Sequence, residues 1–177
     1  YDFDICGSAT VKEAYQIKDK IQELNNSIID YFKLINTGTI DPFINHWGLR
    51  NTQYIKGAYV KPVIANNDLN KISVKRASQA KSAKIIIAGM TKTIEAYFDF
   101  GGILAGKSTS IILGDIKKLM ALNVLLNSSL LSFWFSKNYN SLSMSGGYFN
   151  VGIHELGSLP IPDQLFSKYL ETFSRLN

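Results

Sequence analysis

The chain has 177 residues, of which 46% are hydrophobic and 19% charged, and its formal net charge is +5. This balance excludes a disordered chain, because there is enough apolar surface for a core, and the length suits one domain. The single cysteine, Cys6, excludes an intrachain disulfide and favours a reducing cytoplasm. The first residues, YDFD, are neither an initiator methionine nor a signal peptide, so we expect a piece of a longer protein.

The N-terminal part predicts one helix and one strand. The motif TVKE forms a capping box, in which the Thr10 hydroxyl and the Glu13 carboxylate satisfy free backbone amides at a helix start. Apolar residues then recur every three or four positions, which predicts a helix that ends at residues 25–27. Residues 31–35 (YFKLI) predict a strand, and the NTGT that follows predicts a turn.

The middle of the chain predicts a sheet of short strands. Residues 40–57 are polar, aromatic and irregular. The next strand carries Pro62, which favours a sheet edge or a bulge. Residues 71–84 are polar and basic and show no clear helical or strand periodicity. No acidic residue occurs from residue 71 to residue 93. Three apolar segments then predict strands separated by glycine-rich turns; they span residues 84–88, 94–100 and 110–113.

The C-terminal part predicts helices. Asp115 is expected to cap a helix that is apolar nearly all round as far as Phe133, and therefore buried. Its polar interruptions and short length argue against a membrane span. A Ser- and Gly-rich loop at residues 141–152 and a stiff LPIP linker follow. Asp163 is expected to cap a final amphipathic helix.

These elements predict an α+β fold with a mixed, mostly antiparallel sheet of short strands, a buried helix and amphipathic terminal helices. We expect residues 1–162 to form the domain. Residues 163–177 are expected to form a C-terminal amphipathic helix that packs on it or on the rest of the longer protein.

Four segments, taken in order, carry a resemblance to a known family. They are GSAT (residues 7–10), FKLINTGTID (32–41), KIII followed at a distance by AYFD (84–87 and 96–99), and LLNS with the closing LPIP (125–128 and 159–162). With them the chain resembles the TaqI-like specificity domain at the C-terminal end of type IIG restriction enzymes and N6-adenine DNA methyltransferases. It resembles more loosely the specificity subunits of type I restriction systems, whose recognition domains also end in a proline-rich link to a helix.

The resemblance implies a target-recognition domain that binds double-stranded DNA in a bacterial or archaeal cytoplasm. A methyltransferase domain in the same parent chain would bind S-adenosylmethionine and flip the target adenine. This part of the parent is then expected to hold no catalytic residue, no metal, no cofactor and no small-molecule substrate. Whether the parent also cleaves DNA, and which sequence it recognises, stay open.

The motifs of catalysis are not found in the sequence. There is no NPPY motif for a flipped adenine, and no capped helix clearly follows the glycine pattern at residues 101–106, which argues against a nucleotide site. No clustered Asp/Glu pair with a lysine suggests a nuclease metal site. Ser108 and His154 are isolated and make no triad, and two histidines with one cysteine make no metal set.

Four segments offer the side chains that hold phosphates or read base edges. The candidate DNA-binding residues are Arg50, Asn51, Gln53 and Lys56; Lys75, Arg76, Ser78, Gln79 and Lys81; Lys107; and Ser143 and Tyr148. Arg50, Asn51 and Gln53 are the expected base readers. The basic run is expected to contact phosphates or enter a groove. The Ser- and Gly-rich loop around residue 143 would bring backbone amides close to phosphates, and Lys107 beside Gly106 is a fourth candidate site.

Each segment also has a purely structural interpretation. Residues 46–53 suit an ordinary surface loop with Trp47 in the core, and we interpret His46 as structural. The basic run suits a solvated charged face, and the loop near Ser143 a plain connection. We interpret the NTGT turn as structural.

Three functional hypotheses follow. They are a recognition domain fused to an adenine methyltransferase, a recognition domain of a type I specificity subunit, and a protein-interaction module whose basic face is incidental. The last predicts only weak duplex binding that salt abolishes.

Overall fold

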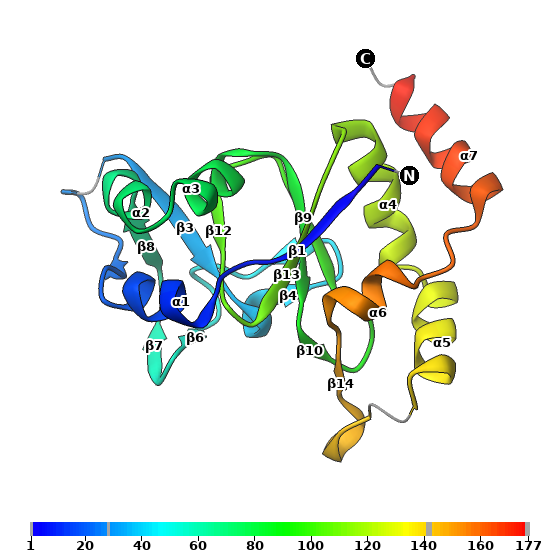
Figure 1. The fold of residues 1–177 in the computed structure, drawn as a ribbon, viewed down its shortest axis with the longest axis horizontal. Coiled ribbons are helices and arrows are strands. Elements are labelled where there is room, and N and C mark those ends of the chain that lie inside the picture. The colour runs from blue at the N-terminus through cyan, green and yellow to red at the C-terminus, as the bar shows by residue number, and fades with distance from the viewer. Residues whose placement is uncertain (1, 28, 141–142, 176–177) are drawn as a thin grey trace.

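Two four-stranded sheets share an inner apolar core, and helices cover the outer face of each sheet (Figure 1). The structure, a computed structural model, describes residues 2–27, 29–140 and 143–175. The layers follow one another along the long axis, with α1 to α3 at one end and α4 to α7 at the other (Figure 1). The fold is α+β, and its pairing is mostly antiparallel, as the sequence predicts.

The first sheet is antiparallel throughout. In spatial order it consists of β1 (Asp4–Gly7), β13 (Thr109–Leu113), β9 (Lys84–Ala88) and β11 (Ala96–Asp99). Every residue of β9 is buried. Ile85 and Ile87 contact the C-terminal helices, while Ile86 and Ala88 face the inner core. This alternation explains why the segment has no polar face.

The second sheet mixes parallel and antiparallel pairs. In spatial order it consists of β12 (Ile103–Ala105), β3 (Tyr31–Ile35), β8 (Pro62–Ala65) and β2 (Gln22–Glu23). Only β12 and β3 run parallel. Pro62 is the first residue of β8, a position where its missing N–H is tolerated. The prediction of an edge or a bulge is therefore wrong, because β2 and β3 flank β8.

Three helices cover the second sheet. They are α1 (Val11–Lys18), α2 (Asn66–Ile72) and α3 (Val74–Lys81). The capping box before α1 is confirmed, although the helix ends earlier than predicted because residues 22 and 23 pair with β8. The basic segment predicted without period is helical. The inward face of α3 carries Ala77 and Ala80 beside two polar side chains, so it shows no apolar stripe.

Four helices form the opposite end. They are α4 (Ile116–Leu126), α5 (Ser129–Asn138), α6 (Ile153–Gly157) and α7 (Asp163–Ser174). Asp115 caps α4 as predicted, with its carboxylate accepting two backbone N–H bonds. The predicted single helix breaks in two. Asn127 bonds both backbone groups of Ala96, and Ser128 caps α5.

Helix α7 packs on α4 within this domain. Phe166 is 1% exposed, and its ring meets that of Phe3 edge-on at a centroid distance of 6.1 Å. Asp163 is the first helical residue and Pro162 holds the cap position, so the predicted cap is displaced by one residue. Residues 176 and 177 of the predicted helix, and 141 and 142 of the predicted loop, lie outside the described residues.

Short strand pairs project from this frame. They are β4 (Ile40–Asp41) with β5 (Ile44–Asn45), β6 (Thr52–Tyr54) with β7 (Gly57–Tyr59), and β10 (Met90–Thr91) with β14 (Phe149–Asn150). Single turns of 3-10 helix accompany them in the described part of the chain, among them η1 (Thr37–Thr39) and η3 (Ser145–Gly147). Among the described residues, no single helix has the length and hydropathy of a membrane span. The pair α4 and α5 passes that test only jointly and is bent by 66°.

Candidate nucleic-acid interface

The NTGT turn ties together three segments that line one side of the molecule. The Asn36 side chain accepts a hydrogen bond from the Ser108 amide (3.1 Å) and donates one to the Gln53 carbonyl (2.8 Å). The Thr37 hydroxyl donates to the Ser108 carbonyl and accepts from the Gly89 amide (3.1 Å). The turn thereby holds β6, the end of β9 and the loop after β12 in fixed relation. Its role is structural, as the sequence interpretation has it.

Close backbone approach at this junction gives a stability prediction. A Cβ on Gly89 would lie 2.4 Å from the Ser108 carbonyl oxygen, whereas one on Gly38 would meet nothing within 4 Å. We expect Gly89→Ala to lower the free energy of unfolding by about 1–3 kcal/mol, because backbone has to shift. Gly38→Ala, the matched control, should change it by less than about 1 kcal/mol. Urea denaturation of both variants measures this, and equal effects would contradict the tight junction.

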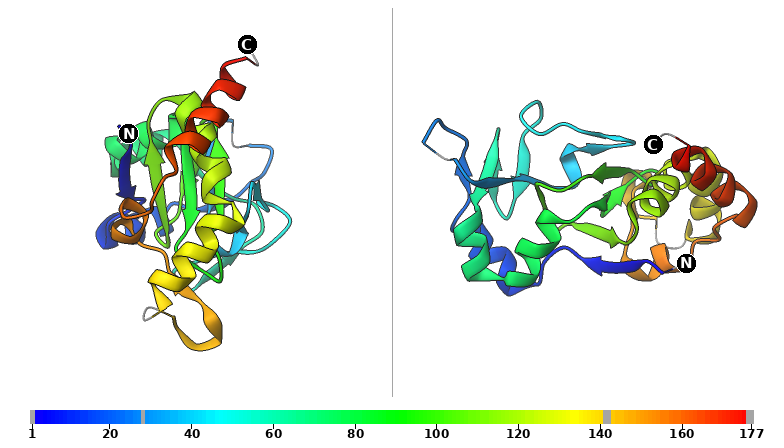
Figure 2. Two further views of the ribbon diagram at one scale, coloured as in Figure 1. Left: turned by 90° about the vertical axis from the view of Figure 1, so that its right-hand side faces the viewer. Right: turned by 90° about the horizontal axis from the view of Figure 1, so that it is seen from above.

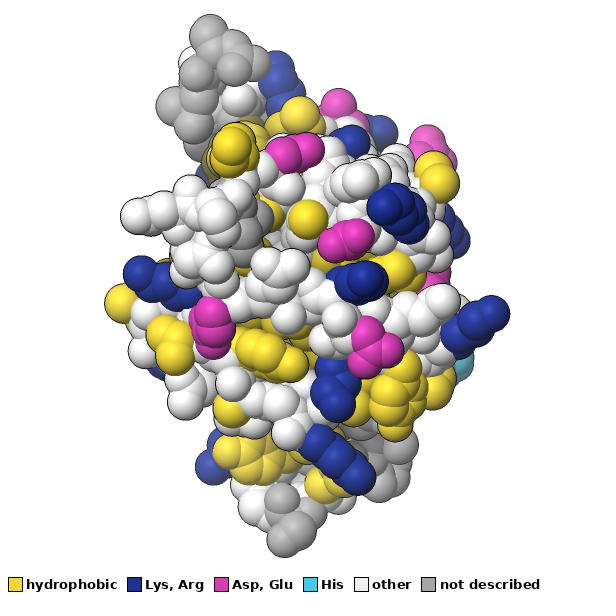
Figure 3. Space-filling model, turned by 90° about the vertical axis from the view of Figure 1, so that its left-hand side faces the viewer, with side chains coloured by type: hydrophobic (Ala, Val, Ile, Leu, Met, Phe, Trp, Pro, Cys, Tyr) yellow, Lys and Arg dark blue, Asp and Glu magenta, His cyan; other side chains and the backbone are white. Residues whose placement is uncertain are grey.

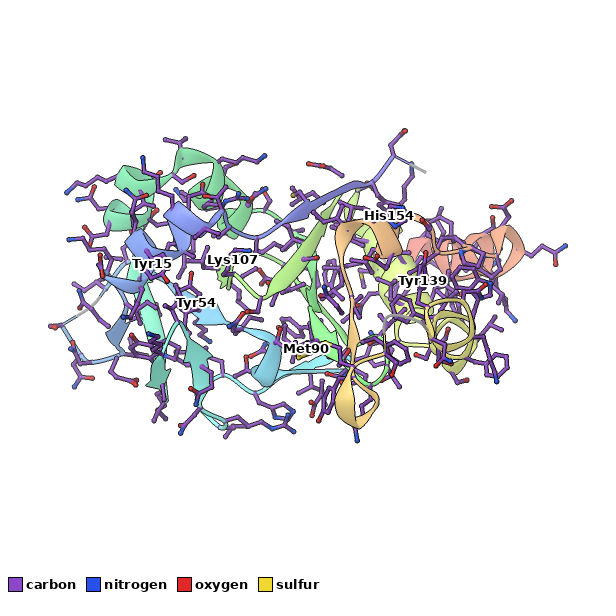
Figure 4. All side chains as sticks on the ribbon, turned by 60° about the horizontal axis from the view of Figure 1, so that its bottom comes forward. Tyr15, Tyr54, Met90, Lys107, Tyr139 and His154 are labelled. Carbon is purple, nitrogen blue, oxygen red and sulfur yellow. The ribbon has the colours of Figure 1, made fainter. Side chains whose placement is uncertain are left out.

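Two adjoining grooves lie on this side. The smaller, of about 210 Å³, is lined by residues of η1, β4, β10 and the segment before β14, among them Arg50, Glu95 and Tyr148. The larger, of about 420 Å³, is lined by Lys107 and Ser108 and by residues around β14 and α6. Met90 is 48% exposed and lines both grooves, so they are neighbours on the surface. Figure 4 shows Met90 and Lys107 on this surface, between the β6–β7 hairpin and the β14 segment. We call it the concave face.

Arg50 is held in one orientation at the edge of the smaller groove. It ends a tight turn in which the Leu49 and Arg50 amides donate to the His46 carbonyl, each at 2.9 Å, and Gly48 has a positive φ of 79°. Its two terminal nitrogens donate to the two carboxylate oxygens of Asp41, at 2.8 and 2.6 Å. The His46 ring also contacts Asp41, at 2.8 Å. The Arg50 hydrogen bonds are the main cause that lowers the pKa of Asp41.

Two further side chains shape the same groove. Burial raises the pKa of Glu95, and the negative charge of Asp41 raises it further. Within the described residues no hydrogen bond reaches the Glu95 carboxylate. Tyr148 is 42% exposed, and the Lys92 ammonium lies 5.3 Å from its ring centroid. The groove thus combines one guanidinium, two carboxylates and an aromatic ring, with a lysine at its rim.

The β6–β7 hairpin carries Gln53 and Lys56, whose side chains are exposed, and Asn51, also exposed, precedes it. Its turn residues Ile55 and Lys56 both have positive φ, 38° and 56°, which is a strained conformation for a β-branched residue. Tyr54, 1% exposed, anchors the hairpin in the core of the second sheet.

The segment before β14 forms the other border of the concave face. It carries Ser143, which is exposed and bridges to Phe149, together with Tyr148. Gly146 and Gly147 both have positive φ, 81° and 77°, so the turn between Ser143 and Tyr148 needs glycine.

The α3 candidates divide between surface and interior. Lys75, Ser78 and Lys81 are exposed. Arg76 and Gln79 are both 7% exposed, and this burial argues against the direct DNA contacts predicted for them. Arg76 pairs with Glu13, bonds the Gly7 carbonyl and donates to Gln79. A buried charge is retained here because several acceptors surround it.

The α3 surface and the concave face lie on different sides of the molecule. Seen from above, α3 and the β6–β7 hairpin project in opposite directions (Figure 2). Lys and Arg side chains at the α1–α3 end alternate with acidic and apolar ones (Figure 3). Residues 71–84 carry only basic charges in the sequence. In the fold, acidic residues of neighbouring segments, such as Asp68 of α2, lie at the same end of the molecule.

The sequence interpretation missed several residues of the concave face. Asp41, Met90, Lys92 and Glu95 line or border the smaller groove. Asp41 lies within the FKLINTGTID segment, and this was the only indication in the sequence that it belongs to the site. The others follow β9 in a stretch that carries no motif.

Among the described residues, no group of His, Cys, Asp and Glu is arranged to hold a metal ion. The chain matches no protein-family model and no curated protein sequence.

Proposed function

We propose that the chain is a DNA target-recognition domain of a restriction-modification enzyme that methylates adenine. The observation that carries the proposal is the concave face, where Arg50, Lys92, Lys107 and Tyr148 line or border two neighbouring grooves. Basic side chains, exposed amide groups and an aromatic ring on a rigid frame are what duplex recognition requires. The ordered resemblance described above supports the same function.

In this proposal the lysines contact phosphates and the smaller groove meets base edges. Lys107 extends from a turn that Asn36 holds through the Ser108 amide, and Lys92 lies against the Tyr148 ring, so phosphate contacts there would set the register of the duplex. Gln53 and Lys56 on the β6–β7 hairpin would enter a groove of the DNA, and Ser143 would approach the backbone on the far side. The α3 surface takes no part.

The chemistry belongs to another part of the parent protein. S-adenosylmethionine and the flipped adenine would be bound by a methyltransferase domain in the same parent chain, in a bacterial or archaeal cytoplasm. The recognition domain holds the duplex and positions its target, and we assign it no catalytic residue.

Two double variants test which surface binds DNA. Lys92→Ser/Lys107→Ser and Lys75→Ser/Lys81→Ser each remove two exposed lysines, one pair on the concave face and the other on α3. Random duplexes are selected by the wild-type chain at two salt concentrations and sequenced. The affinity of each variant for the selected duplex is then measured against salt.

We expect one short site to be enriched and to survive the higher salt. The concave-face variant should bind about tenfold more weakly or worse and lower the salt slope by about 1.8, because two phosphate contacts are lost. The α3 variant should bind like the wild type. Enrichment of no site would refute DNA recognition. A loss confined to the α3 variant would instead move the interface to α3.

A further inference from the structure

We propose that the smaller groove reads a G·C base pair, with Arg50 binding guanine and Glu95 binding the paired cytosine. This inference rests on the proposed function and names the base pair that this site recognises. It follows from the orientation of one guanidinium, from the charges around it and from the unpaired acceptor beside it.

Asp41 leaves the guanine-reading edge of Arg50 free. Guanidinium has five N–H donors in a planar fork. The carboxylate of Asp41 takes one from each terminal nitrogen, at 2.8 and 2.6 Å. Three donors remain, and two of them, the Nε–H and the outer N–H of the neighbouring terminal nitrogen, are parallel and match the O6 and N7 acceptors of guanine. Since His46 also holds Asp41, the arginine loses little conformational freedom on binding.

The charge of the groove favours a base over a phosphate. Asp41 and Glu95 line the same groove as Arg50 and both act on it electrostatically, so two carboxylates accompany a single guanidinium. A phosphate brought to Arg50 would meet this negative charge, whereas the edge of a base carries none. The exposed lysines, Lys92 and Lys107, lie at the rim of this groove and in the adjoining one, where the DNA backbone would run.

Glu95 supplies the complementary half of the recognition. Its carboxylate lines the groove and, among the described residues, accepts no hydrogen bond. In the major groove, the amino groups of cytosine and adenine are the base donors that a carboxylate binds. A single G·C pair presents both kinds of group side by side, the O6 and N7 acceptors of guanine and the amino donor of the paired cytosine. Arg50 and Glu95 in one groove of about 210 Å³ therefore match this pair.

The experiment measures base preference at each position of the selected site. Duplexes in which each base pair is replaced in turn compete for the wild-type chain, for Arg50→Lys and for Glu95→Ala. Arg175→Lys is the matched control, because Arg175 is also exposed and carboxylate-paired but lies at the end of α7. Circular dichroism confirms that each variant is folded.

We expect the wild type to prefer G·C at one position by about 5- to 150-fold, the usual range for a bidentate base contact. Arg50→Lys should lose most of this preference at that position alone, and Glu95→Ala should reduce it there, while Arg175→Lys keeps it. If Arg50→Lys weakens all duplexes equally, Arg50 is a phosphate contact and the inference fails, although DNA recognition stands. An unchanged preference also overturns it. If the wild type selects no site, both proposals fall together.

Discussion

Replacing Lys84 with methionine is expected to lower the free energy of unfolding by about 3–5 kcal/mol. Lys84 is 1% exposed and Asp99 4%. The Lys84 ammonium pairs with the Asp99 carboxylate and donates to the Ala80 and Ser82 carbonyls, both at 3.2 Å. Burial lowers the pKa of Lys84, against the opposing effect of Asp99. Methionine would leave the Asp99 charge buried without its partner, which is the costly change.

The double variant Lys84→Met/Asp99→Leu separates the pair from the packing. Because an apolar pair of similar volume fits such a site, the double variant should recover most of the lost stability. Guanidinium denaturation of the wild type, both single variants and the double variant gives the coupling energy. A Lys84→Met variant within about 1 kcal/mol of the wild type would mean that the pair does not hold the end of α3 against β9 and β11.

Lys84 also illustrates what sequence patterns do not predict. The KIIIA segment predicts a buried strand correctly, because an apolar run without polar alternation suits a strand covered on both faces. The same pattern says nothing about the lysine at its start. Its burial depends on Asp99 in the paired strand and on the carbonyls at the end of α3. The capping box and the Asp115 cap were predictable because their hydrogen bonds join residues close together in the sequence.

Some residues of the candidate site were predictable from the sequence, but its arrangement was not. Arg50 and Tyr148 were each predicted from the sequence, yet it is the two-residue pairing of β10 with β14 that brings Tyr148 to the groove that Arg50 lines. Strands of that length have no sequence period. The orientation of Arg50 depends on Asp41 across the β4–β5 hairpin, a contact between side chains that spacing does not reveal.

Arg76 shows the opposite case, a predicted contact residue that the fold buries. Lys75, Arg76 and Lys81 look alike in sequence, but the helical period of α3 turns Arg76 inward, toward Glu13 of α1. Helix-forming residues without an apolar stripe gave no indication of which side faces the core. The distinction between a buried ion pair and a DNA contact therefore needed the structure, and it gives a test.

Arg76→Met is expected to lower the free energy of unfolding by about 3 kcal/mol at pH 7 while leaving DNA affinity of the folded chain unchanged. Burial would raise the pKa of Glu13, but hydrogen bonds from the Thr10 amide, from Arg76 and from Ser73 outweigh it and lower the pKa to about 2. A carboxyl whose pKa is depressed in the folded state stabilises fully above its ordinary value near 4.5. That contribution declines as the pH falls towards 2.

The acid limb distinguishes this ion pair from a purely steric role. Since Arg76 helps to depress the Glu13 pKa, the variant should lose less stability than the wild type between pH 7 and pH 3, and the gap between them should narrow. Urea denaturation at both pH values measures this, with Arg175→Met as the exposed control expected to stay within about 0.5 kcal/mol. A gap independent of pH would contradict the pairing. If an Arg76→Met variant is stably folded but no longer binds DNA, Arg76 takes part in the interface. A buried side chain can do so only if α3 faces the duplex or moves to expose it.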